Sequence, residues 1–420
     1  MIIRETQNNG IRVVAETMEQ VRSCAIGVWM GTGSANEMQD EAGISHFIEH
    51  MLFKGTATRS AQDIAAEMDS IGGNINAFTS KECTCYYVKV LDEHIDKAVD
   101  ILADIVQHST LSPEEIAKEQ GVVAEEILMV EDTPEDLAHE RVATLYYQED
   151  PLAKPILGTE ASVRSFNRDK LQRYMRRQYV GERIVIAVAG RFCEAQLLPL
   201  LQEKFAFVPA GEAPKLANNR APGGRRFEAV EKDIEQIHIC MALPGTFIDS
   251  IDQYPLFVLS NALGGSMSSR LFQRIREERG LAYSVYSYPS CYATTGSFAV
   301  YAGTGEQQAV EVTRLIMEEL REISRNGITN EEFVRCRDQL KGSYLLGQEG
   351  TSSRMSALGK SELLLRRQYN EEENIRRIEA ITMDDIMRII PTVLDVKNMS
   401  TVCVGRISRQ EAQLREMLQA

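Results

Sequence analysis

The chain has 420 residues, of which 44% are hydrophobic and 25% charged, the usual balance of a globular protein. This composition excludes collagen-like and disordered chains, and no run approaches the roughly 18 apolar residues of a membrane-spanning helix. The formal net charge of −15 repels phosphate backbones, so we expect no nucleic-acid partner, whereas a cationic peptide would be attracted. At about 150 residues per domain, the length indicates two or three domains.

The eight cysteines are scattered along the chain and form no CxxC pair. The first ten residues, MIIRETQNNG, lack the basic and apolar regions of a secretory signal. We therefore expect reduced thiols in a cytoplasmic protein, and neither a disulfide framework nor a cysteine zinc site.

The first segment with chemical content is Ile44–Leu52, ISHFIEHML. On a helix, His46 and His50 would lie on one face, and Glu49 would border that face. Two neutral imidazoles can bind Zn²⁺, and a nearby carboxylate that does not bind the metal can move a proton. The order H-x-x-E-H is the inverse of the H-E-x-x-H helix of zinc proteases. The alternative is two structural histidines that happen to be four residues apart.

Further along the chain, the alternation in residues 83–90, CTCYYVKV, predicts a strand with Lys89 off the apolar side. Two helices are predicted over 113–131 and 134–147. Ser112 and Thr133 each precede a proline and acidic residues, which is typical of a capped helix N-terminus.

A catalytic zinc site needs a third protein ligand, and the first of these helices offers several acidic candidates: Glu114, Glu115, Glu119, Glu125 and Glu126. Glu119 and Glu126 are seven residues apart, so two helical turns bring them back to the same side. One could bind the metal while the other supports a ligand through a hydrogen bond. Spacing alone does not choose among the candidates, and most acidic residues on such a helix face solvent.

The segment 208–226 is rich in proline, glycine and alanine, and predicts a linker close to the midpoint of the chain. The two halves repeat one pattern, in which a strand, a glycine turn and a helix precede paired strands and another helix. We therefore predict an α+β protein of two homologous domains, 1–207 and 227–420, each a mostly antiparallel sheet packed with helices.

Three blocks give the whole chain a resemblance to a known family: HFIEHMLFKGT, GGNINAFTSKECTCYY and DPLAKPILGT. They are similar to the inverzincin metallopeptidases, which include pitrilysin and insulin-degrading enzyme. In length and motif, the chain most resembles the mitochondrial processing peptidase β subunit and its bacterial homologues. The resemblance implies the fold of that group.

The resemblance also implies the roles of the metal-site residues. One zinc ion per chain would be held by three ligands: His46, His50 and Glu126. The family's sequence distance between the second histidine and the third ligand selects Glu126 over Glu125. Glu49 would act as the general base, and Glu119 would orient a metal ligand through a hydrogen bond without binding the metal itself.

Substrate contacts are implied in the same way. Asn76 and Ala77 match a sheet edge on which the family binds peptides as an added strand, although they could form an ordinary polar edge. Phe53 matches a pocket residue, or it is core. Asp136 and Glu140 match an acidic pair that receives substrate, or else they are plain surface residues. Arg276 and Tyr283 match a pair that reaches toward substrate, or else they are a surface arginine and a packed tyrosine. The second half carries no metal ligands, because Leu256, Leu259 and Ser260 stand at the corresponding positions.

Longer relatives enclose a chamber with four such domains, so this two-domain chain is expected to form a homodimer or to pair with an inactive relative. The expected function is a zinc metalloendopeptidase of the processing-peptidase type that cleaves short or unfolded peptides in that chamber. One alternative is a non-catalytic scaffold or partner subunit, which would not need all four site residues. The other is a peptide-binding module with structural zinc, but such zinc usually has four protein ligands.

Overall fold

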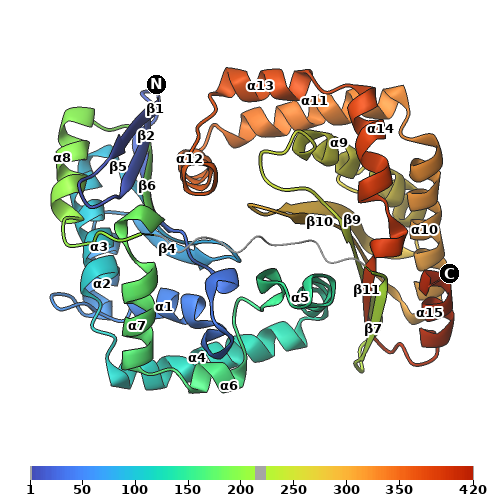
Figure 1. Ribbon diagram of the computed structural model, residues 1–420, viewed down its shortest axis with the longest axis horizontal. Helices are drawn as coiled ribbons and strands as arrows, with labels where there is room; N and C mark the ends of the chain where they lie inside the picture. The colour runs from blue at the N-terminus through green and yellow to red at the C-terminus, as the bar shows by residue number, and fades with distance from the viewer. Residues whose placement is uncertain (1, 213–223, 420) are drawn as a thin grey trace. The chain divides into compact units, whose positions relative to one another are not determined.

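The structure is a computed structural model that describes residues 2–212 and 224–419. The chain forms two compact units, each built on one sheet (Figure 1). Unit 1 contains the described residues of 1–127, 154–217 and 345–370, and unit 2 contains those of 128–153, 218–344 and 371–420.

Unit 1 has a six-stranded sheet in the order β1-β2-β6-β3-β5-β4, in which only β2 and β6 pair in parallel. Its strands are β1 Ile2–Thr6, β2 Arg12–Thr17, β3 Ser23–Met30, β4 Asn74–Thr79, β5 Thr84–Leu91 and β6 Ile184–Gly190. Its helices are α1 Ile44–Leu52, α2 Ala61–Ser70, α3 Ile95–His108, most of α4 Pro113–Asp132, α6 Glu160–Arg164, α7 Arg168–Gln178, α8 Glu194–Lys204 and α12 Thr351–Leu365.

The central strand β6, IVIAVAG, is buried along its whole length because both faces of the sheet are covered. Ile184, Ile186 and Val188 point into one core together with α1 and α3. Val185 and Ala187 alternate with them and pack in a second core with Met355 of α12. The period of two along the strand thus places α12 on the sheet face opposite α1.

Unit 2 has a five-stranded sheet in the order β7-β11-β8-β10-β9, in which only β7 and β11 pair in parallel. Its strands are β7 Arg226–Glu231, β8 Gln236–Pro244, β9 Ala282–Cys291, β10 Gly296–Gly305 and β11 Ser400–Gly405. Its helices are α5 Pro134–Tyr147, α9 Gln253–Leu263, a π-helical turn Phe272–Glu277, α10 Ala309–Asn326, most of α11 Asn330–Gly347, α13 Glu371–Glu379, α14 Met383–Val393 and α15 Glu411–Gln419.

The units therefore differ from the predicted ranges 1–207 and 227–420, because each contains a helix from the other half of the chain. Helix α5 packs on β8 and β11 of unit 2, and α12 packs on β2, β3 and β6 of unit 1. In each unit, the helix from the other half of the chain covers a sheet face that would otherwise expose apolar side chains. The predicted linker 208–226 falls mostly outside the described residues.

The predicted fold class is confirmed, since both sheets are mostly antiparallel and packed with helices. The helices predicted over 113–131 and 134–147 begin at the expected prolines and end within one residue of the prediction. Thr133 does not cap α5 as predicted, because its hydroxyl donates to the carbonyl of Met129 at 2.8 Å. The eight cysteines, all in the described part, are free thiols.

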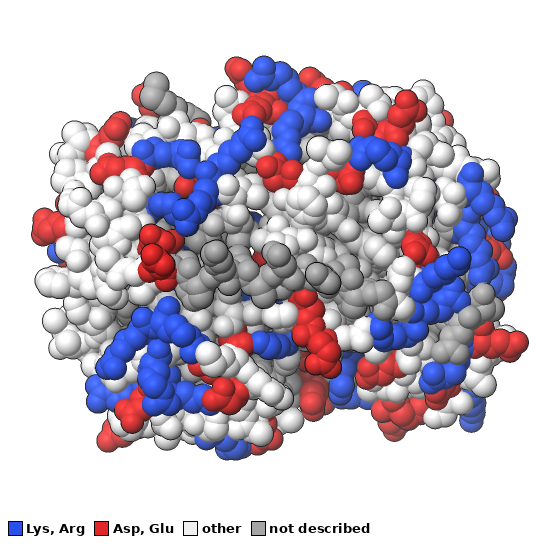
Figure 2. Space-filling view, in the orientation of Figure 1, with Lys and Arg blue, Asp and Glu red and all other residues white. Residues whose placement is uncertain are grey.

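Charge is mixed on the surface. On the face in Figure 2, acidic and basic side chains are interspersed, so the net charge of −15 does not gather there in one patch. Within residues 2–212 and 224–419, no helix is long and apolar enough to cross a lipid bilayer.

Candidate metal centre

Helix α1 is fixed at its N-terminus by a buried carboxylate. Glu37 is 3% exposed and accepts hydrogen bonds from the backbone N–H of Gly43 at 2.8 Å and of Ser45 at 2.9 Å. Free N–H groups at a helix start favour such an acceptor. The hydroxyls of Ser45 and Tyr174 lie 2.7 Å apart and tie the same turn to α7.

A close backbone contact brings the third block of the resemblance, DPLAKPILGT, against this helix start. Gly43 has a φ of 87°, and a Cβ there would lie 2.4 Å from the carbonyl oxygen of Leu157. Gly158 has a φ of 76° and approaches Ala42 as closely from the other side. Both the left-handed conformation and the lack of space require glycine at these two positions.

The two imidazoles of α1 face each other, as their spacing on the helix predicts. His46 Nε2 and His50 Nε2 lie 3.2 Å apart. Glu126 Oε2 of α4 lies 3.7 Å from the first nitrogen and 3.5 Å from the second. Donor atoms around a tetrahedral zinc ion with bonds of ~2.0–2.1 Å lie about 3.3–3.4 Å apart. The three side chains therefore fit one zinc ion.

On helix α4, Glu126 and not Glu125 lies near the two imidazoles. Glu125 is exposed, whereas Glu126 lies on the side that faces α1, two turns beyond the buried Glu119. Within residues 2–212 and 224–419, His46, His50 and Glu126 form the one group of three such side chains that could hold a metal ion. Spacing alone left this choice open, the resemblance selected Glu126, and the structure places Glu126 beside the imidazoles.

His50 is held from behind by a carboxylate. Its Nδ1–H donates to Glu119 Oε1 at 2.8 Å, which leaves Nε2 directed at the other two donors. The second carboxylate oxygen of Glu119 lies 2.7 Å from Nζ of Lys54. In contrast, Nδ1 of His46 is buried and has no hydrogen-bond partner among the described residues. The two ligands therefore differ in how firmly their rings are oriented.

Glu49 lies beside the donors and is held by the neighbouring strand. The hydroxyl of Thr79, the last residue of β4, donates to Glu49 Oε2 at 2.5 Å. Burial raises the pKa of Glu49, and the hydrogen bond from Thr79 offsets this only in part. A carboxyl group with a raised pKa next to a metal-ligand set is suited to accept and return a proton.

The two histidines titrate differently. Burial, together with the nearby His50, lowers the pKa of His46 to about 3. Burial acts in the same direction on His50, but its hydrogen bond with Glu119 and the charge of Glu126 raise its pKa above the usual value. Although burial opposes it, the hydrogen bonds from His50 and Lys54 lower the pKa of Glu119.

The predicted substrate strand is the edge strand of the sheet in unit 1. β4 pairs only with β5 in the strand order, so its other side is open. The N–H of Ala77 is bonded to Oδ1 of the adjacent Asn76 at 2.8 Å and not to β5. Ala77 therefore directs its N–H toward the open edge, where the Asn76 side chain accepts it. Phe53, which directly follows α1, packs against the core of unit 1, and its ring centre lies 6.3 Å from that of Tyr86.

The remaining predicted residues lie in unit 2. The Arg276 guanidinium stacks on Phe272 and on Tyr283, with 4.7 Å to each ring centre, and Tyr283 is 78% exposed. Asp136 and Glu140 lie one turn apart on α5, with Asp136 exposed. At the positions that correspond to the metal helix, α9 carries the buried residues Leu256, Leu259 and Ser260. This part of α9 thus presents packing residues and a serine where α1 presents imidazoles.

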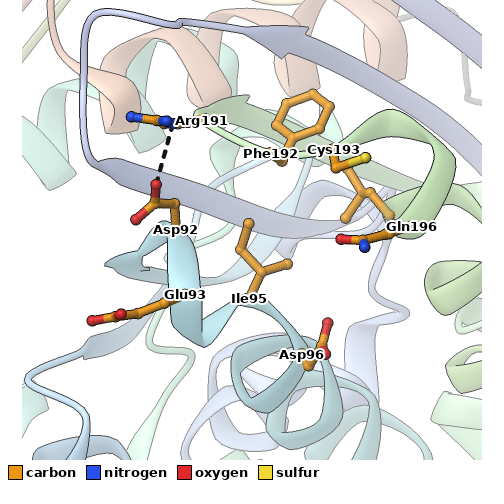
Figure 3. Close-up of a pocket in the computed structure, with 9 residues that line it drawn as sticks. Asp92, Glu93, Ile95, Asp96, Arg191, Phe192, Cys193 and Gln196 are labelled. Atoms are coloured by element: carbon orange, nitrogen blue, oxygen red, sulfur yellow. Dashed lines mark ion pairs between the residues drawn. The ribbon is translucent and has the colours of Figure 1, made fainter.

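A surface pocket elsewhere in unit 1 lies where α3 and α8 begin (Figure 3). Its most polar feature is Asp92, whose carboxylate pairs with Arg191 at 3.3 Å and with Arg22 at 3.1 Å. The exposed Cys193 lies on the opposite wall. Because the Asp92 carboxylate is already paired with two arginines, we assign no chemistry to this pocket.

Two residues that contact the site were not predicted, namely Lys54 and Thr79. Both lie inside blocks that define the resemblance, four residues after His50 and two after Ala77. The spacing of Lys54 from His50, one helical turn, was a usable signal. Thr79 had no such signal, because its contact with Glu49 crosses from a strand to a helix.

Comparison with known proteins agrees with these features. Residues 12–160 match the sequence profile of the insulinase family (peptidase family M16), and residues 165–340 match that of the peptidase M16 inactive domain. The chain is 45% identical over 386 residues to the uncharacterized zinc protease YmxG of Bacillus subtilis, covering 92% of this chain and 94% of the relative. A second relative, an uncharacterized zinc protease of Streptomyces coelicolor, is 37% identical over 418 residues, covering 97% of this chain and 90% of the relative.

Solved structures show the same fold. A crystal structure described as a peptidase M16 inactive domain from Pseudomonas fluorescens superposes with a TM-score of 0.90 at 20% identity, covering 96% of this chain and 98% of the other. A protease from Helicobacter pylori gives a TM-score of 0.90 at 21% identity, covering 96% and 99%. The matching profiles and the close relatives along nearly the whole chain lead to one conclusion: this chain belongs to peptidase family M16, the insulinase family.

Proposed function

We propose that this chain is a zinc metalloendopeptidase of the processing-peptidase type, which cleaves short or unfolded peptides. The observation that carries the proposal is the convergence of His46, His50 and Glu126 from two helices, with Glu49 beside them. Family membership and the zinc-protease relatives support the general activity. Three protein ligands leave a coordination position open, as catalytic zinc sites require.

The chain's own residues divide the chemistry. Bound zinc would lower the pKa of a water molecule and polarise the peptide carbonyl. Glu49 would take the proton from the attacking water and return it to the leaving amine. Thr79 would keep that carboxylate turned toward the reacting atoms. His50, held by Glu119, would be the better oriented of the two imidazole ligands.

Substrate would bind as an added strand along β4 at Asn76 and Ala77, with the backbone of Ala77 supplying a main-chain hydrogen bond at the open edge. Such binding tolerates varied side chains, which suits a broad peptidase. A pocket at Phe53 and the acidic pair Asp136 and Glu140 would add side-chain preference.

The assembly is part of the proposal. We propose a homodimer with one zinc ion per chain, in which four domains enclose a chamber in the cytoplasm. Arg276 and Tyr283 of one subunit would reach substrate at the zinc of the other, where a guanidinium and a phenol can stabilise a developing oxyanion. The stacked arrangement of the two side chains supports a joint role.

Cleavage of quenched peptides of mixed sequence, with and without a chelator, tests the function. We expect zinc-dependent cleavage that a chelator abolishes and added zinc restores. The Glu49→Gln variant should retain one zinc ion per chain and lose activity by about 10³-fold, since general-base catalysis supplies roughly 10²–10⁴-fold. Zinc binding without any cleavage by the native chain would favour a scaffold subunit. Chelator-insensitive cleavage would contradict the zinc mechanism.

A further inference from the structure

We propose that Lys54 is a positioning residue of the metal centre, which acts on His50 through the Glu119 carboxylate. This inference rests on the proposed zinc site. It adds a third layer to the site, behind a ligand and behind the carboxylate that supports that ligand.

The contacts form one chain of charge-assisted hydrogen bonds. Nζ of Lys54 lies 2.7 Å from Glu119 Oε2, and Glu119 Oε1 accepts from His50 Nδ1 at 2.8 Å. Each carboxylate oxygen therefore has one cationic or N–H partner. Two partners on two oxygens fix the rotation of the carboxylate, which a single hydrogen bond does not.

Burial makes the lysine necessary. The Glu119 side chain is 4% exposed, so its charge is nearly removed from water, whereas the Lys54 side chain is 30% exposed and keeps contact with solvent. A buried carboxylate that loses its charged partner is left uncompensated, and such changes are costly. Without Lys54, the carboxylate is expected to turn toward water and to loosen its bond to His50.

The position of Lys54 on the chain suits this task. The residue lies two positions after the end of α1, and its backbone N–H donates to the carbonyl of Met51 in the last turn at 3.1 Å. The lysine and His50 are thus carried by the same end of one helix, and α4 brings Glu119 between them. Through this arrangement the carboxylate holds the His50 ring with Nδ1 protonated and Nε2 free for the metal.

The test is the apparent zinc affinity at constant pH, measured by competition with a chelator of known affinity. Lys54→Met keeps the side-chain length and removes the charge, and we expect zinc affinity to fall by about 10-fold or more, within the 10–100-fold range of outer-sphere changes. Lys118→Met is the matched control. Lys118 pairs with Glu115 at 2.6 Å on the same helix as Glu119, but that lysine is exposed, so affinity should stay within about twofold.

A double variant separates positioning from general damage. If Lys54 acts through Glu119, Glu119→Gln alone and Glu119→Gln with Lys54→Met should bind zinc equally weakly. Lys54→Arg should retain more affinity than Lys54→Met. Thermal unfolding of the zinc-free variants checks that each is folded.

The inference is overturned if Lys54→Met binds zinc as tightly as the native chain. It is also overturned if the double variant binds zinc more weakly than Glu119→Gln alone, because the two losses of affinity would then be independent. Equal losses in the methionine and arginine variants would also contradict it. If the native chain itself binds no zinc, the proposed function fails instead, so the two failures are distinguishable.

Discussion

The two imidazoles at the metal centre are chemically unequal although they share one helix face. His50 donates to a buried carboxylate, while Nδ1 of His46 finds no partner among the described side chains. Burial lowers the pKa of His46 to about 3, and the acidic neighbours raise the pKa of His50 despite its burial. Near pH 6 the first is therefore neutral, and the second carries a proton that zinc must displace.

This difference predicts that zinc binding near pH 6 releases about one proton, and not two. Zinc affinity should rise with pH, about tenfold per unit below the pKa of His50, and level off above it. Calorimetry in two buffers with different ionisation enthalpies counts the protons. Glu49→Gln removes a nearby carboxyl group without removing a ligand, and should release the same number. A release of two protons would show that His46 is also protonated before binding.

At the scale of elements, β4 matters because it ends the sheet. Ala77→Pro removes the backbone N–H at the open edge, and that N–H bonds to Asn76 and not to β5. We expect kcat/KM for peptides to fall by about tenfold, the worth of one hydrogen bond of ~1.5 kcal/mol, with zinc affinity unchanged. Ala77→Ser keeps the N–H and serves as the control. Unchanged kcat/KM in the proline variant would argue against strand addition at this edge.

Helix α12 packs on the sheet of unit 1 with almost no spare space. A Cβ on Gly359 would lie 2.2 Å from Nε1 of Trp29. Gly359→Ala should therefore lower the free energy of unfolding by about 1–3 kcal/mol, the cost of overpacking, although alanine favours helices. Gly342 in α11 has nothing within 4 Å of such a Cβ, so Gly342→Ala should be neutral or raise stability by up to ~1 kcal/mol. Denaturant unfolding of both variants checks the pair, and equal effects would contradict this packing.

Each unit of the molecule contains one helix from the other half of the chain, since α5 belongs to unit 2 and α12 to unit 1. A fragment that ends at Glu212 contains all six strands of the first sheet but lacks α12. One sheet face would then be uncovered, with its apolar residues Val14, Ala25, Trp29, Val185, Ala187 and Ala189.

We expect this fragment to aggregate and to bind a hydrophobic dye, because large exposed apolar patches drive association. The same fragment with residues 345–370 joined at its end should be more soluble. Size-exclusion chromatography and dye fluorescence compare the two. A monomeric fragment 1–212 that unfolds cooperatively would show that α12 is dispensable for unit 1.

Much of this protein is determined by the sequence alone, because the signals are local. The two histidines and Glu49 share a helix turn, the prolines at 113 and 134 start two helices, and alternation marks β5. Repetition of one pattern in both halves predicted the α+β fold class. Each of these features follows from the period of 3.6 or 2 within a single element.

Tertiary structure decided what depends on contacts between elements. Spacing on α4 left Glu125 and Glu126 as alternatives and only the family resemblance selected Glu126, whereas the structure places Glu126 near the imidazoles directly. The contacts of Lys54 with Glu119 and of Thr79 with Glu49 each join two elements, and the exchange of α5 and α12 joins distant parts of the chain. The physical reason is that periodicity fixes which side of an element is apolar, whereas the partner of that side is chosen by burial of the whole chain.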